Sequence, residues 1–150
     1  MHTLKVVIDH HVHKKFNITK LSGLCGNILD IVLQILILFC RVNGLHCILI
    51  TDRDGVPLVR VATDRAPALA LRPNFISTFG MATDQGSKLG LGRNKSVICM
   101  YSNYQVIQIN KLPLVLTFIG SDNCNTGHIM SLEEHIDPLL NDLKLAVTES

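Results

Sequence analysis

The most restrictive feature of this 150-residue chain is a series of strand-like segments joined by links too short to cross a sheet. Segments 96–101, 104–110 and 114–119 follow one another, and Ser102-Asn103 is the whole link between the first two. Because a parallel connection needs a dozen or more residues, neighbouring segments here have to pair antiparallel. This part of the chain therefore predicts a meander of three antiparallel strands.

Two further strand-like segments, 45–50 and 56–61, precede the meander. Asp54-Gly55 lies between them and predicts a hairpin with a type I′ turn, in which both central residues have positive φ. Segment 45–50 is apolar on both faces, which indicates a central strand. The second segment contains a proline and an arginine and is more typical of a sheet edge.

Three helices are expected around these strands. The first lies somewhere inside 24–41, the second begins at Pro73 and runs to residue 89, and the third covers 125–147. The apolar spacing of the third helix continues in phase across Pro138, which favours a kinked helix over two separate ones. A capping box leaves Ser131 open as an alternative start. The element order is α-β-β-α-β-β-β-α, an α+β fold with one five-stranded antiparallel sheet between helices.

Hydrophobic residues make up 47% of the chain and the mean hydropathy is +0.32, which is high for a soluble domain of this size. The most apolar segment, 28–40, is too short to span a bilayer and contains Asp30 and Gln34. We therefore expect a buried helix there rather than a membrane anchor. Binding of a partner by the rest of the chain would account for the remaining excess of apolar residues.

The net charge of +2 comes entirely from the first 40 residues, which hold four lysines and two aspartates. The remainder is neutral, and its basic residues are mixed with acidic ones without interleaved aromatic residues. This pattern predicts a solvated surface of mixed charge and excludes a nucleic-acid binder.

The five cysteines occur without a Cys-x-x-Cys pair, and an odd number of them argues against a disulfide framework. Reduced, buried thiols in a cytosolic setting are expected for Cys25, Cys40, Cys47, Cys99 and Cys124.

No catalytic, metal or cofactor site is predicted. The segment 51–55 lacks the ligand spacing of a calcium loop, and a hairpin turn explains its aspartates. The glycine-rich segment 85–92 lacks the spacing of a phosphate-binding loop and suits the end of a helix. The histidine tract at residues 10–13 has no matching cysteines or carboxylates. We find no pairing of a nucleophile with a base and no placed acidic pair.

Several motifs together carry a resemblance to a known family. They are Gly44-Leu45-His46, Asp52-Arg53-Asp54-Gly55-Val56-Pro57, Ala70-Leu71-Arg72-Pro73, Ser77-Thr78-Phe79, the segment 82–91, Asn94-Lys95-Ser96 and Asn125-Thr126-Gly127. In these motifs the chain resembles the roadblock/dynein-light-chain superfamily, and within it the MEK-partner scaffold subunits of the Ragulator complex. The resemblance is clear from residue 41 and places a roadblock domain at 28–150, behind an unmatched N-terminal extension at 1–27.

The resemblance implies a non-catalytic adaptor without a cofactor, which forms an obligate heterodimer with a sister roadblock subunit, Ragulator subunit 2. It also implies further Ragulator subunits as partners, and a place on the cytoplasmic face of late endosomes and lysosomes through another, lipidated subunit. There the complex would scaffold MEK and ERK and support Rag GTPase and mTOR complex 1 signalling.

In this family the two subunits associate through the middle helix and the edge strand after it, which correspond here to 73–89 and 96–101. The residues expected at this interface are Phe75, Phe79, Ala82, Gly86, Val97, Ile98, Cys99 and Met100. Core packing within the chain is expected for at least one of the two phenylalanines. Segment 96–101 has neither proline nor charge, so as an edge strand it would be unprotected, whereas Pro57 and Arg60 protect the opposite edge. Small residues at 80, 82 and 86 would let two helices approach closely.

The N-terminal helix departs from the family pattern. The family has a short, amphipathic, lysine-rich helix, whereas 28–40 is apolar all round and by itself predicts burial on every side. Two rival hypotheses stay open: a homodimeric roadblock module that regulates a small GTPase directly, and a membrane protein anchored by residues 24–40.

Overall fold

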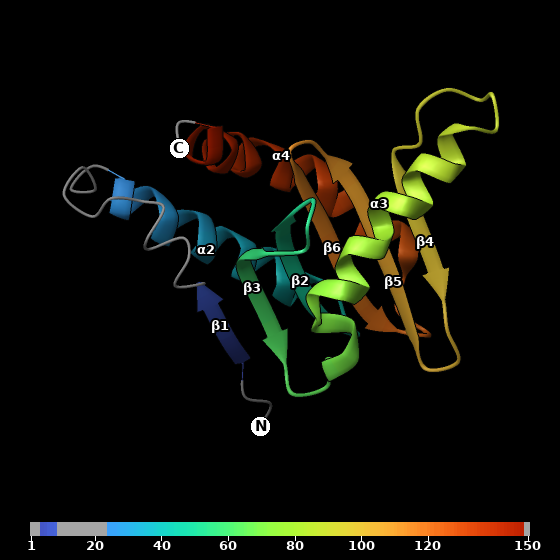
Figure 1. Cartoon of the computed structure of the whole chain (residues 1–150). Coiled ribbons are helices and arrows are strands. Elements are labelled where there is room, and N and C mark those ends of the chain that lie inside the picture. Colours follow the sequence, from blue (N-terminus) through green and yellow to red (C-terminus); the bar gives the residue numbers. More distant parts are fainter. Residues whose placement is uncertain (1–3, 9–23, 149–150) are drawn as a thin grey trace.

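The structure is a computed structural model that describes residues 4–8 and 24–148 (Figure 1). A single antiparallel sheet has α3 on one face and α2 and α4 on the other. The elements are β1 Leu4–Ile8, α2 Leu24–Arg41, β2 Leu45–Asp52, β3 Pro57–Thr63, the 3₁₀ helix η2 Ala68–Leu71, α3 Pro73–Ser87, β4 Ser96–Met100, β5 Tyr104–Lys111, β6 Leu114–Ser121 and α4 Thr126–Thr148. The predicted order of three helices and five strands is confirmed from α2 onward.

The sheet has six strands rather than five, in the order β1-β3-β2-β6-β5-β4. The added strand β1 pairs with residues 59–63 of β3, so β3 is an inner strand and the prediction that it forms an edge is wrong. Arg60 lies opposite Val7 in this ladder, and Pro57 begins β3 outside it. Leu4–Ile8 was missed because a lone five-residue apolar segment does not reveal which strand it pairs with.

Alternation along the strands divides the core into two layers. Ile48 and Phe118 face α2 and α4 and belong to the larger cluster, whereas Cys47, Leu49 and Ile119 face α3. Segment 45–50 is buried throughout, as expected of a central strand covered on both faces.

Helix α2 has one buried and one open face. Ile31, Ile35 and Phe39 lie in the core, whereas Leu33 and Ile37 are 57% and 55% exposed. The prediction of burial on every side is therefore wrong, because the sheet covers only one side of this helix. Within the described residues, no helix has both the length and the hydropathy needed to cross a bilayer.

The turn between β2 and β3 is not of type I′. Gly55 has a φ of +82°, but no non-glycine residue among those described has a positive φ, which excludes Asp54. The Asp52 carboxylate accepts the N–H of Asp54 at 3.0 Å and of Val56 at 2.8 Å. These bonds favour a turn with a left-handed glycine at its end over the mirror-image turn.

Helix α4 begins at Thr126 and includes Pro138, so it is one helix and Ser131 is not its start. The Ser131 hydroxyl instead donates to the carbonyl of His128 at 2.7 Å. The predicted kink stays a prediction. The histidine tract and most of segment 1–27 lie outside the described residues.

The thiols at positions 40, 47, 99 and 124 are free, but only two of them are buried. Cys47 and Cys124 agree with the prediction, whereas Cys40 lies on the open face of α2 and Cys99 is half-buried. The expectation that every thiol is buried is therefore wrong at two positions, and the burial of Cys25 lies outside what the structure describes.

Candidate interaction surface

Strand β4 forms the edge of the sheet opposite β1 (Figure 1). The N–H of Asn110 donates to the carbonyl of Lys95 at 2.8 Å, and that of Tyr101 donates to the carbonyl of Tyr104 at 2.7 Å. In an antiparallel ladder such bonded pairs alternate with unbonded ones. The alternation leaves the backbone groups of three residues pointing away from β5: Ser96, Ile98 and Met100.

The side chains of β4 are apolar and partly open to solvent. Ile98 is 46% exposed and Met100 is 61% exposed, whereas Val97 and Cys99 are half-buried. No proline or charged residue interrupts the strand. Such an edge can accept a further strand, because nothing on it opposes pairing.

Helix α3 packs on the sheet through Ile76 and Phe79 and leaves its other side open. Phe79 is a core residue of this chain, whereas Phe75 is half-buried and Ala82 is exposed. Core packing of at least one phenylalanine is therefore confirmed, at Phe79, and Phe75 packs partly against the core but has surface left for a partner.

The small residues of α3 have different surroundings. Gly80 has open space where a Cβ would lie, whereas a Cβ on Gly86 would come within 3.2 Å of Nδ2 of Asn94. The N–H of Asn94 in turn donates to the Ser87 hydroxyl at 3.0 Å. Gly86 thus brings the end of α3 close to the start of β4 within this chain, and Gly80 and Ala82 form the open small-residue surface.

The link between α3 and β4 adds apolar surface that sequence reasoning missed. Leu89 and Leu91 are 74% and 91% exposed, and each precedes a glycine of positive φ, Gly90 or Gly92. Met81 on α3 is also exposed. The only signal in the sequence is the alternation of leucine with glycine, which does not reveal exposure.

Tyr101 closes the surface at the far end of β4 and is 51% exposed. Partial burial is the main cause that raises the pKa of its hydroxyl, and the nearby Cys99 is the second cause.

Within residues 4–8 and 24–148, no group of three or more histidine, cysteine or acidic side chains is arranged to hold a metal ion. The arrangement is suited to binding another protein chain through a strand edge and a helix face.

The chain is similar in sequence to a described protein family and to several curated proteins. The family model described as "Mitogen-activated protein kinase kinase 1 interacting" matches residues 29–147. The Ragulator complex protein LAMTOR3 homolog of Drosophila melanogaster is 63% identical over 110 residues, which are 73% of this chain and 89% of that protein. The Ragulator complex protein LAMTOR3 of Homo sapiens is 59% identical over 109 residues, 73% of this chain and 88% of that protein.

Solved structures at low identity share the fold. A structure described as MglB with tetrameric arrangement has a TM-score of 0.64 at 16% identity, over 77% of this chain and 89% of that one. A roadblock/LC7 domain from Streptomyces avermitilis has a TM-score of 0.53 at 10% identity, over 74% and 92%. The fold is therefore the roadblock/LC7 fold, as expected. By its family match and its identity to the Ragulator complex proteins, the chain belongs to the mitogen-activated protein kinase kinase 1 interacting family.

Proposed function

We propose that this chain is a non-catalytic scaffold subunit of a Ragulator complex and forms an obligate heterodimer with a sister roadblock subunit through α3 and β4. The observation that carries the proposal is the outward-facing backbone of Ser96, Ile98 and Met100 on an uncharged edge strand. A second edge strand would satisfy these groups and extend two sheets into one.

The side chains around this edge support the same proposal. Phe75, Ala82, Val97, Ile98, Cys99 and Met100 would contact the partner. Phe79 and Gly86 would act from within the chain by holding α3 against the sheet and against Asn94. An obligate interface of this kind commonly buries about 2,000 Å² or more in total.

The assembled complex would scaffold the kinases MEK and ERK and support Rag GTPase signalling to mTOR complex 1. The family description, which names a mitogen-activated protein kinase kinase, and the relatives' names as Ragulator complex proteins support this role. We further propose that the chain lies on the cytoplasmic face of late endosomes and lysosomes, held there through a lipidated subunit of the complex.

Co-expression with Ragulator subunit 2 tests the proposal. Light scattering on the purified material should give the mass of a one-to-one complex. A monodisperse, stable monomer that does not bind the sister subunit would overturn the proposal. A stable homodimer that changes the nucleotide hydrolysis of a small GTPase would instead favour the rival hypothesis of direct regulation.

A further inference from the structure

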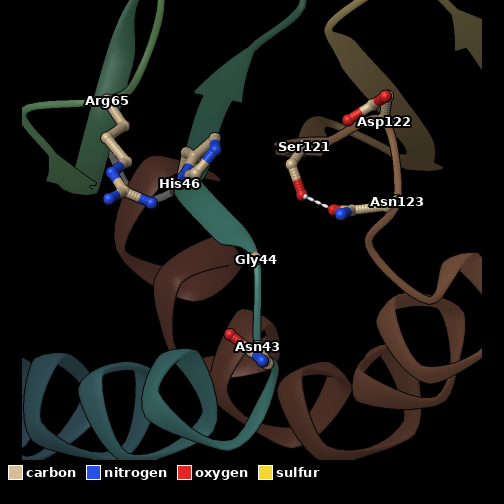
Figure 2. A pocket seen from close by; sticks show the side chains of 7 residues that line it. All are labelled: Asn43, Gly44, His46, Arg65, Ser121, Asp122 and Asn123. Atoms are coloured by element: carbon tan, nitrogen blue, oxygen red, sulfur yellow. Dashed lines mark hydrogen bonds between the residues drawn. The ribbon is translucent and has the colours of Figure 1, made fainter.

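A polar hollow of about 410 Å³ lies at one end of the sheet, where α2 leads into β2 and where β3 and β6 end. Figure 2 shows Arg65 and His46 on one side and Ser121, Asp122 and Asn123 on the other, with Gly44 between them. Among the described residues, no apolar side chain lines this hollow. An adjoining hollow of about 420 Å³ shares Asn43, Gly44, His46 and Arg65 with the first and adds Arg41, Cys40, Thr63 and the apolar residues Phe39, Val42 and Leu45.

The charge of this double hollow is positive. Arg41 and Arg65 line it, and Asp122 is the only carboxylate among the described residues that does so. The structure gives neither arginine an ion pair within the part of the chain that it describes. Arginine presents a planar fork of donors that matches a carboxylate, so two unpaired guanidinium groups here are suited to acidic side chains.

The walls of the hollow are held in place by contacts within the chain. His46 is 7% exposed, and its ring packs edge-on against that of Tyr104 with the ring centroids 6.1 Å apart. The backbone carbonyl of His46 accepts a hydrogen bond from the Thr63 hydroxyl at 3.4 Å. On the other wall, the Ser121 hydroxyl donates to Oδ1 of Asn123 at 2.7 Å. A preformed polar site loses less entropy on binding than one that must be ordered first.

Gly44 makes the close approach of the two walls possible. Its φ is +85°, and a Cβ there would lie 2.7 Å from the Ser121 hydroxyl oxygen. The N–H of Ser121 donates to the Gly44 carbonyl at 2.9 Å. The glycine of the Gly44-Leu45-His46 motif therefore joins the start of β2 to the end of β6 at the floor of the hollow.

We propose that this hollow binds an acidic segment of a partner protein, with carboxylates received by Arg65 and Arg41. The two hollows share four lining residues, and together they exceed the size of a single inorganic anion and suit several consecutive side chains. Asn43 and Asn123 provide amide groups for the peptide backbone, and Asp122 provides an acceptor. None of the lining residues belongs to α3 or β4, so the proposal does not depend on the proposed heterodimer.

Fluorescence anisotropy on the full chain tests the proposal, with a fluorescein-labelled octapeptide of alternating glutamate, serine and aspartate as the probe. Saturable binding is expected, and Arg65→Glu or Arg41→Glu should weaken it about tenfold or more. Arg53→Glu is the matched control, since Arg53 is an exposed arginine in the turn between β2 and β3, at the other end of β2. It should leave the affinity within about twofold, since it reverses only a distant, solvent-screened charge. Circular dichroism would verify that all three variants stay folded.

Three results would overturn the proposal. The first is no saturable binding of the acidic peptide by the wild-type chain. The second is an equal loss with Arg53→Glu, which would show a general charge effect. The third is binding to vesicles that contain phosphatidylinositol phosphates while the peptide fails to bind, which would assign the two arginines to a membrane surface.

Discussion

The hydroxyl of Thr126, the first residue of α4, donates a hydrogen bond to the side-chain carbonyl of Gln105 on β5 at 2.6 Å. The amide nitrogen of Gln105 donates to the carbonyl of Cys124 at 2.6 Å and to that of Ser121 at 3.0 Å. Gln105 is fully buried. One buried amide therefore holds both the start of α4 and the loop that forms one wall of the polar hollow.

Replacing this amide should destabilise the fold strongly. Gln105→Leu keeps the volume but removes three hydrogen bonds, and the Cys124 carbonyl and the Thr126 hydroxyl lose this partner, whereas the Ser121 carbonyl still accepts the N–H of Cys124 at 3.1 Å. The free energy of unfolding should therefore fall by about 2–4 kcal/mol in urea titration. Gln108→Leu is the matched control, because Gln108 is also buried but its hydrogen bonds are long, at 3.4 and 3.5 Å. It should cost about 1 kcal/mol or less. Equal costs would show that the Gln105 network contributes little.

Substitution of the turn glycine Gly55 should destabilise the fold more than substitution of Gly90, which has a similar φ. A Cβ at Gly55 would lie 2.6 Å from the Pro73 carbonyl oxygen, whereas Gly90, at a φ of +77°, has nothing within 4 Å. Gly90→Ala adds backbone strain alone, about 1 kcal/mol. Gly55→Ala also displaces the start of α3 and should cost at least about twice as much in thermal or urea unfolding. Equal costs would contradict the close packing of the turn on α3.

The thiols should differ in reactivity. Burial raises the pKa of Cys47 to about 12 against the smaller opposing effect of Arg60, whereas Cys40 lies exposed on α2. Because the thiolate is the reactive form, native protein at about pH 8 should alkylate at Cys40 first, at half-buried Cys99 later and at Cys47 only after unfolding. A mass-spectrometric time course with iodoacetamide checks this order. Early labelling of Cys47 would contradict the burial of β2.

The ion pairs between Lys111 and α4 should stabilise the fold up to alkaline pH. The Lys111 ammonium lies 2.5 Å from Glu133 and 2.7 Å from Asp137. Burial acts to lower the pKa of Lys111, but the hydrogen bonds and charges of the two carboxylates outweigh it, and the pKa is raised. The stabilisation is therefore complete below the pKa of an unfolded lysine, about 10.4, and is lost as the pH rises through the folded value.

Lys111→Met removes this contribution. We expect the variant to be less stable than the wild type by about 1 kcal/mol near neutral pH, with the difference shrinking above about pH 10.5. Urea titrations at several pH values give the comparison. A difference that grows with rising pH would contradict the sign of the pKa shift.

Much of the fold could be predicted because its signals are local. The link at residues 102–103 requires an antiparallel turn, and Pro73 marks the first turn of α3. The exposure of Leu33 and Ile37 was not predicted, because these residues are as apolar as Ile35. The polar residues Asp30, Gln34 and Arg41 lie on the same exposed side of α2 at helical spacing, and they are the signal in the sequence that marks it. The prediction of a type I′ turn was wrong because the Asp52 carboxylate accepts two backbone N–H groups and so stabilises a different turn conformation.

The open edge of the candidate surface could be predicted from composition, whereas the exposed side of α3 and the polar hollow depend on tertiary structure. The absence of charge and proline in β4 identified an open edge. The burial of Phe79 against the exposure of Ala82 depends on how α3 is rotated on the sheet. The polar hollow depends on Arg41 and Arg65, which are far apart in sequence and line one site only because the β2–β3 hairpin returns the chain to the end of α2.

The central claim is that the outer backbone of β4 binds the sister subunit, and a proline at one position tests it most directly. Ile98→Pro removes an outward N–H and leaves the bonds to β5 intact, because proline is tolerated where the N–H of an edge strand faces outward. Ile98→Ala is the control, since it shortens the side chain and keeps the donor. Both variants would be co-expressed with Ragulator subunit 2 and measured by size exclusion with light scattering. We predict a one-to-one complex for Ile98→Ala and its loss for Ile98→Pro, with both variants folded by circular dichroism. A one-to-one complex of undiminished yield for Ile98→Pro would contradict strand pairing through β4.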